Sequence, residues 1–593
     1  MTISTADITH WLAQFALTLD QGDFAAATDL FHAEGFWRDL VTFTWNIKTA
    51  EGHEAIHAML AATVSAVKPT SWQANGDVTI ADGVAAGWFT FETAVAKGKG
   101  HLRLKDGKCW TLFTAMVELK DFAEKKGATR PLGTQHGAFK ERKSWLELKE
   151  QEEAELGYHC QPYCLIIGGG QGGIALAARL RRLEVSTIIV EKNARAGDSW
   201  RKRYRSLCLH DVIWQNHLPY LPFPDDWPVF IPKDKMGDWL ECYTKIMELN
   251  YWSSTECQSA HYDEATETWR VVVNRAGQAV VLRPRQLVLA TGMSGMPNIP
   301  NIPGAERFQG DLHHSSKYTD GATYAGQRCI VLGSNNSAHD ICADLWEHGA
   351  DVTMIQRSST LVAKSETLFA SSRYSEASVQ AGITTAEIDA QAATMPYKLQ
   401  AMQAIPIWRQ IREQDGELYD SLAKVGFMLD FGEDDTGLGM KYMRRGSGYY
   451  IDVGASALIA SGEIKLRSGV TITEIKERSV ILSDGRELPA DLIVYATGYG
   501  SMNSWAARLI SQEVADKVGK CWGLGSNTKY DPGPWEGELR NMWKPTQQPG
   551  LWFHGGNLQQ SRYYSQQLAF QIKARMEGLP TPVYGLQPVH HIA

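Results

Sequence analysis

The segment Cys164-Leu-Ile-Ile-Gly-Gly-Gly-Gln-Gly-Gly173 joins a short apolar strand directly to a glycine-rich turn. Residues 174–183 continue with the small and apolar side chains of a packed helix, and a second apolar run, 186–190, ends on Glu191. Strand, tight turn, helix, strand and terminal acid follow one another in the order of a βαβ unit that binds a dinucleotide. We therefore expect an α/β fold of the Rossmann type in this part of the chain.

The glycines and the acid of this unit have separate tasks. Gly168 permits the tight turn, Gly170 lets the backbone approach a pyrophosphate, and Gly173 lets the helix pack closely on the strand. Gly172 lies in the first turn of the helix, where free N–H groups face the phosphates. Glu191 follows Gly168 by 23 residues and is placed to accept the ribose hydroxyls. The alternative is a glycine-rich turn in any doubly wound sheet, and the flanking strand, helix and acid argue against it.

A second, degenerate copy of the motif follows the apolar run 329–332. It reads Gly333-Ser-Asn335-Asn-Ser337-Ala338 and leads into a helix that extends to about residue 348. Alanine is tolerated at the third glycine position of such motifs. Asn335 stands at the second position, and we expect it to fit because asparagine adopts positive φ more readily than most residues. The segment predicts a second dinucleotide site.

The end of the next strand, 351–356, indicates which nucleotide this second site binds. An NAD site would have Asp or Glu there, whereas this chain continues with Gln356-Arg357-Ser358. A missing acid and an adjacent arginine favour the 2′-phosphate of NADPH. NADH stays open as an alternative donor, and so does a purely structural βαβ unit with an exposed Arg357.

Length and composition limit the remaining possibilities. A chain of 593 residues is too long to fold around a single hydrophobic core. Its net charge of −8 does not indicate the basic surface that nucleic-acid binding usually requires. The start MTISTADITH lacks the basic region of a secretory signal, and no apolar stretch reaches 18 residues. We expect a cytoplasmic protein with nine reduced cysteines and no transmembrane segment.

Five segments of different character follow one another along the chain. They are an α+β domain (1–130), a charged linker (131–160), a first dinucleotide domain (161–326), a second one with a mostly helical insertion at about 365–450 (327–490), and a return to the first domain with a C-terminal tail (491–593). In the last segment, 555–565 is expected to precede a closing helix, 567–576, whose N-terminus is aimed at a bound ring.

Four short stretches carry a family resemblance. Residues 308–318, FQGDLHHSSKY, resemble the FxGxxxHxxx(W/Y) fingerprint, and 197–204, GDSWRKRY, resemble a GGxWxxRY segment. Two apolar strands end in Ala-Thr-Gly, at 290–292 and 496–498, and the second continues as ATGY. No CxxxxC pair follows the first glycine turn, so the chain lacks the signature of a disulfide reductase. The whole is similar to the flavin-containing monooxygenases: type II and Baeyer–Villiger-like members, related to the plant YUCCA-type enzymes.

The resemblance implies FAD at the first site and NADPH at the second. It implies that a C4a-(hydro)peroxyflavin places one atom of O2 in a small organic substrate, by N- or S-oxidation or by Baeyer–Villiger oxidation. Alternatives are oxidative decarboxylation of a 2-oxo acid and an uncoupled NADPH oxidase. The implied cofactor contacts are Gly168, Gly170, Gly172, Gly173, Glu191, Trp200, Gly292, Gly333, Asn335, Ser337, Ala338, Arg357, Thr497, Gly498 and Asn557.

Two further residues are assigned near the reaction. His314 is expected at the hinge between the two nucleotide domains, and Asn216 is expected to approach the flavin ring. The substrate and the oligomeric state, a homo-oligomer included, stay open at this point.

The N-terminal domain resembles the SnoaL-like cone fold. The resemblance depends on the segment WRDLVTFTWNIKTAEGHEAI, 37–56, and on the expected elements: helices at 8–19, 24–31 and 55–67, and strands at 36–45, 85–95 and 110–119. The same region contains His53-Glu-Ala-Ile-His57, which matches the HExxH pattern of zinc peptidases. Because GHEAI also fits the helix of the cone fold and no third ligand is evident, we expect no metal site.

Overall fold

The N-terminal domain is a six-stranded sheet covered on one face by three helices. The computed structural model describes residues 5–133, 137–293, 295–370 and 372–589. The strands have the order β2-β1-β6-β5-β4-β3, and all neighbours are antiparallel except β1 and β6. The elements are α1 (Thr5–Gln21), α2 (Phe24–Asp29), β1 (Phe31–Leu40), β2 (Ile47–Glu51), α3 (Gly52–Val67), β3 (Thr70–Ala81), β4 (Val84–Glu92), β5 (Ala96–Lys105) and β6 (Lys108–Leu119).

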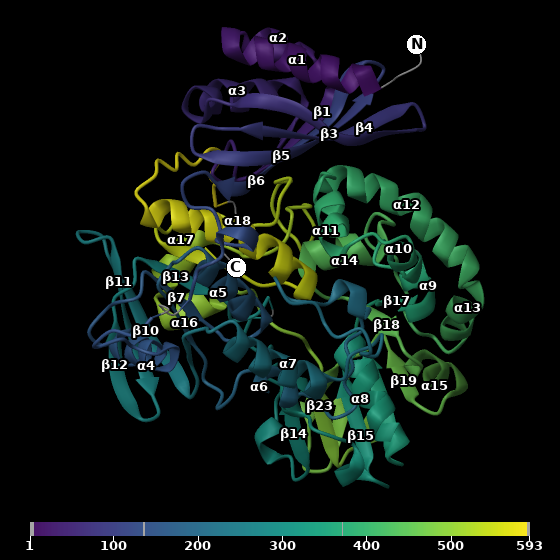
Figure 1. Cartoon of the computed structure of the whole chain (residues 1–593). Coiled ribbons are helices and arrows are strands. Elements are labelled where there is room, and N and C mark those ends of the chain that lie inside the picture. Colours follow the sequence, from purple (N-terminus) through teal and green to yellow (C-terminus); the bar gives the residue numbers. More distant parts are fainter. Residues whose placement is uncertain (1–4, 134–136, 294, 371, 590–593) are drawn as a thin grey trace.

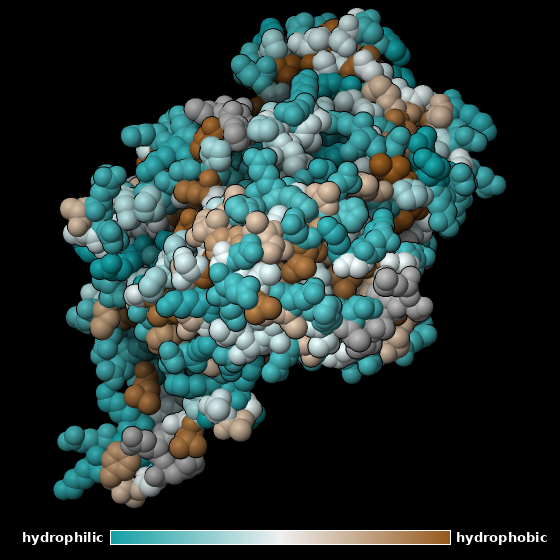
Figure 2. Space-filling model, turned by 90° about the horizontal axis from the view of Figure 1, so that it is seen from above, coloured by the Kyte–Doolittle hydropathy of each residue, from teal (hydrophilic) through white to brown (hydrophobic). Residues whose placement is uncertain are grey.

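Aromatic rings fill the space between these helices and the sheet. Trp11 stacks on Phe15 at 4.8 Å between ring centroids, and Trp37 meets Phe43 edge-on at 4.8 Å. All four side chains are buried. The helices lie on the outer side of the molecule, and β5 and β6 face the rest of the chain (Figure 1). Seen from above, the molecule is mostly hydrophilic with only small scattered apolar patches (Figure 2). The inner face of the sheet is therefore the one that meets the other domains.

One predicted strand is wrong in this domain. The range 36–45 was expected to be extended, but β1 ends at Leu40 and the chain reverses into β2. Val41 and Trp45 have positive φ angles of 71° and 48°. The buried carboxylate of Asp39 stabilises the turn, because it accepts hydrogen bonds from Phe43 N at 3.0 Å and Thr44 N at 2.9 Å.

The first dinucleotide unit is a five-stranded parallel sheet of order β24-β13-β7-β8-β9. Helices α5 and α18 pack against each other on it. An antiparallel sheet of β10, β11 and β12 accompanies it. The elements are β7 (Cys164–Ile167), α5 (Gln171–Arg182), β8 (Thr187–Val190), α6 (Asp198–Arg201), α7 (Lys233–Ile246), β9 (Tyr251–Trp252), β10 (Thr255–Asp263), β11 (Thr268–Arg275), β12 (Gln278–Leu282), β13 (Gln286–Leu289), α16 (Asn503–Leu509), α17 (Gln512–Val518), β24 (Leu551–Phe553) and α18 (Leu558–Met576). Before it, the linker holds helix α4 (Trp145–Glu155).

The second unit is another five-stranded parallel sheet, of order β14-β23-β15-β16-β19. Both β14 and β23 fall outside the range 327–490 expected for this unit. They belong to its sheet because β23 inserts between β14 and β15 and completes the ladder. The elements are β14 (Asp311–His314), β15 (Arg328–Leu332), α8 (Asn336–Glu347), β16 (Asp351–Gln356), α15 (Ala455–Ser461), β19 (Lys465–Ser468), β20 (Ile472–Ile475), β21 (Ser479–Leu482), β22 (Glu487–Pro489) and β23 (Leu492–Tyr495).

The insertion is a helical layer closed at its base by a pair of strands. Strands β17 (Leu361–Lys364) and β18 (Tyr449–Asp452) pair in parallel, so the chain leaves and re-enters the second unit at one place. Figure 1 shows the insertion beside the two sheets and below the N-terminal domain. Its helices are α9 (Ser365–Ala370), α10 (Glu376–Gln380), α11 (Thr385–Ala393), α12 (Tyr397–Gln414), α13 (Gly416–Lys424) and α14 (Gly437–Arg445).

The described residues contain neither a membrane-spanning helix nor a cluster of metal ligands. No helix among them is both long enough and apolar enough to cross a bilayer. No group of three or more His, Cys, Asp or Glu side chains in the same residues is arranged to hold a metal ion. His53 of the HExxH match instead contacts the Phe31 carbonyl oxygen through Nε2 at 3.0 Å.

Candidate cofactor and active site

A cavity of about 700 Å³ lies at the carboxyl ends of the strands of the first sheet. Its wall includes seven of the predicted cofactor contacts: Gly168, Gly170, Gly172, Glu191, Trp200, Gly292 and Asn557. Other lining residues were not assigned as cofactor contacts from the sequence, although Arg203 and Tyr499 lie within the quoted motifs; they include Asn193, Arg203, Tyr442, Tyr449, Tyr499 and Arg508. Because Tyr442 and Tyr449 follow from the folding of the insertion, no local motif could have identified them.

The glycine turn is built as the motif requires. Gly168 has a φ of +107°, and a Cβ added there would lie 2.4 Å from the Ala290 carbonyl oxygen. A Cβ on Gly173 would lie 2.1 Å from the Gly168 carbonyl oxygen. At Gly170, in contrast, the nearest atom would be 3.9 Å away. Gly168 and Gly173 therefore allow close backbone packing, whereas Gly170 leaves open space on the cavity side for a ligand.

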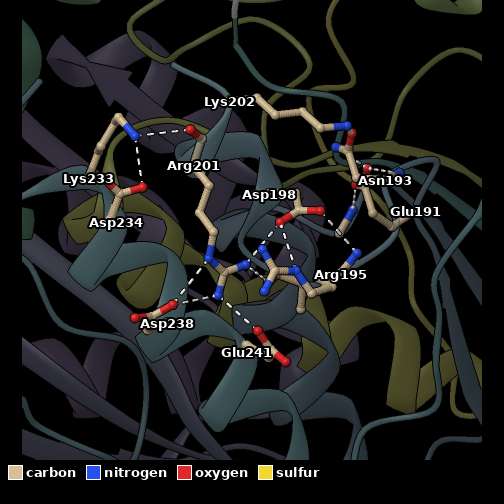
Figure 3. Close-up of polar contacts among 12 residues, drawn as sticks. Glu191, Asn193, Arg195, Asp198, Arg201, Lys202, Lys233, Asp234, Asp238 and Glu241 are labelled. Carbon is tan, nitrogen blue, oxygen red and sulfur yellow. Dashed lines mark hydrogen bonds and ion pairs between the residues drawn. The ribbon is translucent and has the colours of Figure 1, made fainter. Parts of the chain in front are cut away.

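Glu191 is held beside this turn at the end of β8. Its carboxylate is only 8% exposed. One oxygen accepts a hydrogen bond from Gly169 N at 2.8 Å. The other accepts from the backbone N and the side-chain Nδ2 of Asn193, at 2.9 and 2.7 Å (Figure 3). The acid is thus fixed at the cavity wall, with its orientation set by two backbone donors and the side-chain amide of Asn193.

Helix α6 brings Trp200 to the cavity. Arg201 fixes this short helix on α7 through ion pairs with Asp238 at 2.8 Å and Glu241 at 2.9 Å, and it also pairs within α6 with Asp198 at 3.0 Å (Figure 3). A Cβ on Gly197 would lie 2.1 Å from the Gly237 carbonyl oxygen, so the two helices could not approach with any larger residue there. Trp200 Nε1 donates to Gln171 Oε1 at 3.3 Å. The GDSWRKRY segment therefore forms one side of the wall of the large cavity.

The N-terminus of α18 closes the far end of the cavity. Asn557 caps the helix by accepting a hydrogen bond from Gln560 N at 2.9 Å, and Gly555 and Gly556 line the wall beside it. The prediction of a helix over 567–576 is wrong in its start, because this capping box begins α18 at Leu558. A 19-residue helix aimed this way places the positive end of its dipole at the cavity.

The second glycine motif has a similar backbone in the second sheet. Gly333 has a φ of +135°, and a Cβ there would lie 2.3 Å from the Ala496 carbonyl oxygen. Asn335 caps α8 with a φ of −97°, so the expected positive φ is wrong. Gly170 has an ordinary φ of −79° at the matching position. The second glycine position of the motif therefore does not require glycine for its backbone angle. What this position requires is room for a ligand beside the backbone. Ser337 and the buried Ala338 lie in the first turn of α8.

The strand that ends this second motif is tied to the insertion. The side chain of Gln356 is fully buried and pairs with the Met428 backbone, donating to its carbonyl oxygen at 3.0 Å and accepting from its N at 2.8 Å. Arg357, the next residue, is exposed. The position that an NAD site would give to an acid is occupied here by Gln356, whose side chain has a structural role, and the exposed cation of Arg357 follows it directly.

His314 holds the ATGY loop and does not line the cavity. Its Nδ1 accepts from Ser316 N at 3.1 Å, which leaves Nε2 to donate to the Gly498 carbonyl oxygen at 3.0 Å. Burial lowers the pKa of His314, so the ring is neutral at pH 7. Tyr499, which does line the cavity, meets this ring edge-on at 5.1 Å. Thr497 and Gly498 lie in the same loop but are not part of the cavity wall.

Asn216 is buried and lies outside the residues that line the large cavity. Its amide donates to the Asp211 carbonyl oxygen at 2.8 Å.

Comparison with known proteins identifies the family. The family described as pyridine nucleotide-disulphide oxidoreductase matches residues 165–405. The probable indole-3-pyruvate monooxygenase YUCCA3 of Arabidopsis thaliana is 31% identical over 350 residues, 58% of this chain and 74% of that protein. Indole-3-pyruvate monooxygenase YUCCA1 of Oryza sativa is 30% identical over 365 residues, 60% of this chain and 82% of that protein. The chain belongs to the flavin-dependent monooxygenase family.

The fold of this flavin monooxygenase agrees with that of solved relatives. A crystal structure of cyclohexanone monooxygenase bound to ε-caprolactone superposes with a TM-score of 0.51 at 17% identity, covering 70% of this chain and 88% of that one. All nine cysteines are free, and no CxxxxC pair follows the first glycine turn, so the disulfide chemistry in the name of the matched family has no redox pair here.

Family membership implies that this monooxygenase uses flavin and NADPH, and the cavity suits the first of them. The open space at Gly170 would take a pyrophosphate, which the N-terminus of α5 can bind through free N–H groups. Glu191 is a fixed acceptor for hydroxyl groups. The donor set, with backbone N–H groups at one end and a helix N-terminus at the other, fits a long anionic dinucleotide.

Proposed function

We propose that the protein holds FAD in the large cavity and binds NADPH at the second motif, and that it transfers one oxygen atom of O2 to a small organic substrate. Bound FAD would supply the redox chemistry, with NADPH as the electron donor and O2 as the oxidant. The observation that carries this proposal is the continuity of one cavity from the glycine turn at Gly168 to the capped N-terminus of α18 at Asn557.

In this proposal, residues of the protein bind and orient the two nucleotides and shield the flavin from water. The turn at Gly170 and the start of α5 would hold the pyrophosphate, and Glu191 would hold the ribose. The positive end of α18 favours negative charge at the ring end of the cavity. Arg357 would contact the 2′-phosphate of NADPH. His314 positions Tyr499 by holding the loop at Gly498, and it neither gives nor takes a proton in this role.

The type of oxygenation is open between heteroatom oxidation and Baeyer–Villiger oxidation. Oxidative decarboxylation of a 2-oxo acid is a second candidate, and it is favoured by the similarity to indole-3-pyruvate monooxygenases. For every candidate, water must be excluded from the flavin, because water favours release of hydrogen peroxide. The insertion contributes Tyr442 and Tyr449 to the cavity wall, and the N-terminal domain contacts the insertion through Arg38 and Glu51. In this proposal the two together shield the flavin from water.

The deciding test is isotope incorporation by purified enzyme loaded with FAD. NADPH and 18O2 would be supplied with a thioether, a tertiary amine, a cyclic ketone and a 2-oxo acid, and products would be analysed by mass spectrometry. One 18O atom in one product class would establish the oxygenation and its type. Flavin that is reduced by NADPH but returns only stoichiometric peroxide with all four compounds would overturn the proposal. Arg357→Ala should raise the KM for NADPH and leave the KM for NADH unchanged.

A further inference from the structure

A second cavity, of about 450 Å³, lies between the insertion and the segment that follows α6. Its size is within the ordinary range for small-molecule sites, about 300–1,000 Å³. Four aromatic side chains form much of its wall: Trp214, Phe230, Phe369 and Tyr374. Phe230 and Phe369 meet with ring centroids 5.8 Å apart, and Phe230 is 40% exposed. Such a wall suits a flat apolar molecule that reaches the cavity from solvent.

The charges in this wall all have one sign. Among the described residues of this wall, Glu366 and Glu376 are the only charged ones, and both are exposed near the starts of helices that the insertion contributes. Glu376 accepts a hydrogen bond from Gln380 at 3.0 Å. Within the described part of the chain, neither carboxylate makes an ion pair. A ligand with a positive group would be attracted here, and a carboxylate would be repelled.

A buried network joins this cavity to the larger one. The hydroxyl of Tyr374 donates to Asp389 at 2.6 Å, and Asp389 pairs with Arg562 of α18 at 2.8 Å. Arg562 also donates to the carbonyl oxygens of Gln215 and His217, at 2.8 and 2.7 Å. The same helix begins at Asn557 on the wall of the large cavity, five residues earlier, or roughly 7.5 Å at the rise of an α-helix. One rigid helix therefore supports both cavities.

We propose that the second cavity is a binding site for a hydrophobic aromatic molecule that carries a cationic nitrogen, and that it collects the substrate before oxygenation. That the ligand is the substrate rests on the proposed function. The aromatic wall would bind the ring, and Glu366 and Glu376 would face the cation. The site discriminates against aromatic carboxylates, which would exclude the 2-oxo acids that the names of the YUCCA relatives suggest.

Three probes with the same ring and different charge test this site. Tryptamine is cationic, 3-methylindole is neutral and indole-3-acetate is anionic, and their binding to the FAD-loaded enzyme can be measured by calorimetry without NADPH. We expect tryptamine to bind roughly tenfold more tightly than indole-3-acetate, with a difference that shrinks as salt is added. The double variant Glu366→Gln, Glu376→Gln should weaken tryptamine binding by about three- to tenfold and leave 3-methylindole unchanged.

Two further variants locate the effect. Phe369→Ala should weaken binding of all three probes by a similar factor, because it removes ring contact alone. Glu413→Gln changes an exposed carboxylate of α12 outside the cavity and should change none of them. Equal binding of indole-3-acetate and tryptamine, or full retention of tryptamine binding in the double variant, would overturn the inference. Because no turnover is involved, this failure is distinct from failure of 18O incorporation, which would overturn the proposed function.

Discussion

At the residue scale, alanine substitutions at two glycines of the first glycine turn should differ in their effects on folding stability and on FAD binding. Gly173→Ala forces a Cβ to within 2.1 Å of the Gly168 carbonyl oxygen, so we expect a loss of about 1–3 kcal/mol of folding stability as well as lost flavin. Gly170→Ala has 3.9 Å of clearance and should leave the flavin-free protein as stable as before. It should still weaken FAD binding, since its Cβ occupies the pyrophosphate position.

Thermal melting with and without FAD, together with the flavin content of the purified protein, separates the two effects. Unchanged FAD affinity in Gly170→Ala would show that the ligand does not approach the turn there.

His210 gives the contact between the two nucleotide domains a pH dependence. Its Nε2 lies 3.2 Å from Asp340 of α8, which also accepts from the Tyr204 hydroxyl at 2.5 Å. Burial opposes the charged ring, but the hydrogen bond and charge of Asp340 outweigh it and raise the pKa of His210 above its usual 6.5. A raised pKa stabilises the folded protein fully below pH 6.5, and this contribution is lost as pH rises through the folded value.

His210→Gln should therefore lower stability most at pH 5.5–6, by about 1.5–3 kcal/mol for a lost hydrogen bond to a charged group, and least at high pH. Denaturant unfolding of both proteins across pH measures the difference. A difference that stays constant with pH would mean that folding does not shift the pKa of His210.

From the amino-acid sequence, residues whose role depends on local backbone geometry can be predicted better than residues whose role depends on partners far away along the chain. Gly168 and Gly333 could be assigned from motif spacing alone, because both need positive φ and close packing. Asn335 was assigned a positive φ that it does not have. The error arose because the spacing of the motif shows only where the backbone approaches a ligand. It does not show whether glycine is needed at that position for a positive φ or for the absence of a side chain.

At the scale of elements, α18 and α4 each begin with a capping box and allow a matched comparison. Asn557 caps α18 beside the large cavity, and Ser144 caps α4 on the surface. Substitution of either residue by alanine should cost about 1 kcal/mol of stability. Only Asn557→Ala should also weaken flavin binding, because that helix terminus is part of the cavity wall.

Flavin dissociation constants for the two variants, with urea unfolding as the stability measure, give the comparison. If both variants bound FAD like the unchanged protein, α18 would have no role in holding the flavin.

The insertion shows the limit of sequence patterns for whole elements. Its composition predicts helices, and α9 to α14 occupy most of the range 365–450. The pairing of β17 with β18 and the contact of Gln356 with Met428 could not be predicted. Both join segments more than 70 residues apart, and their hydrogen bonds leave no periodic signal in either segment. The aromatic wall of the second cavity arises in the same way.

At the scale of the whole molecule, a buried ion pair attaches the N-terminal domain to the rest of the chain. Arg38 of β1 pairs with Glu538 at 2.7 Å, and the two side chains are 1% and 2% exposed. The same guanidinium donates to the Ala393 carbonyl oxygen of the insertion at 2.6 Å and to the Tyr564 hydroxyl of α18 at 3.2 Å. One residue therefore connects the sheet, the insertion and the helix whose N-terminus closes the large cavity. The resemblance of this domain to the SnoaL-like fold stays a prediction.

Removing one side of this pair should loosen the cover over the flavin. Arg38→Met leaves Glu538 charged and buried without its partner, which should cost about 3–5 kcal/mol, whereas the double variant Arg38→Met, Glu538→Gln should recover part of that loss. The exposed pair between Lys398 of α12 and Glu51 of β2 joins the same two parts at 3.0 Å, so Lys398→Met is the matched control and should cost less than about 1 kcal/mol.

The functional readout of these variants is the ratio of hydrogen peroxide to NADPH consumed. If the domain excludes water, Arg38→Met should raise this ratio several-fold at unchanged flavin content, the double variant should raise it less, and Lys398→Met should leave it unchanged. An Arg38→Met protein that is destabilised but produces no more peroxide would show that the N-terminal domain stabilises the fold and takes no part in shielding the flavin.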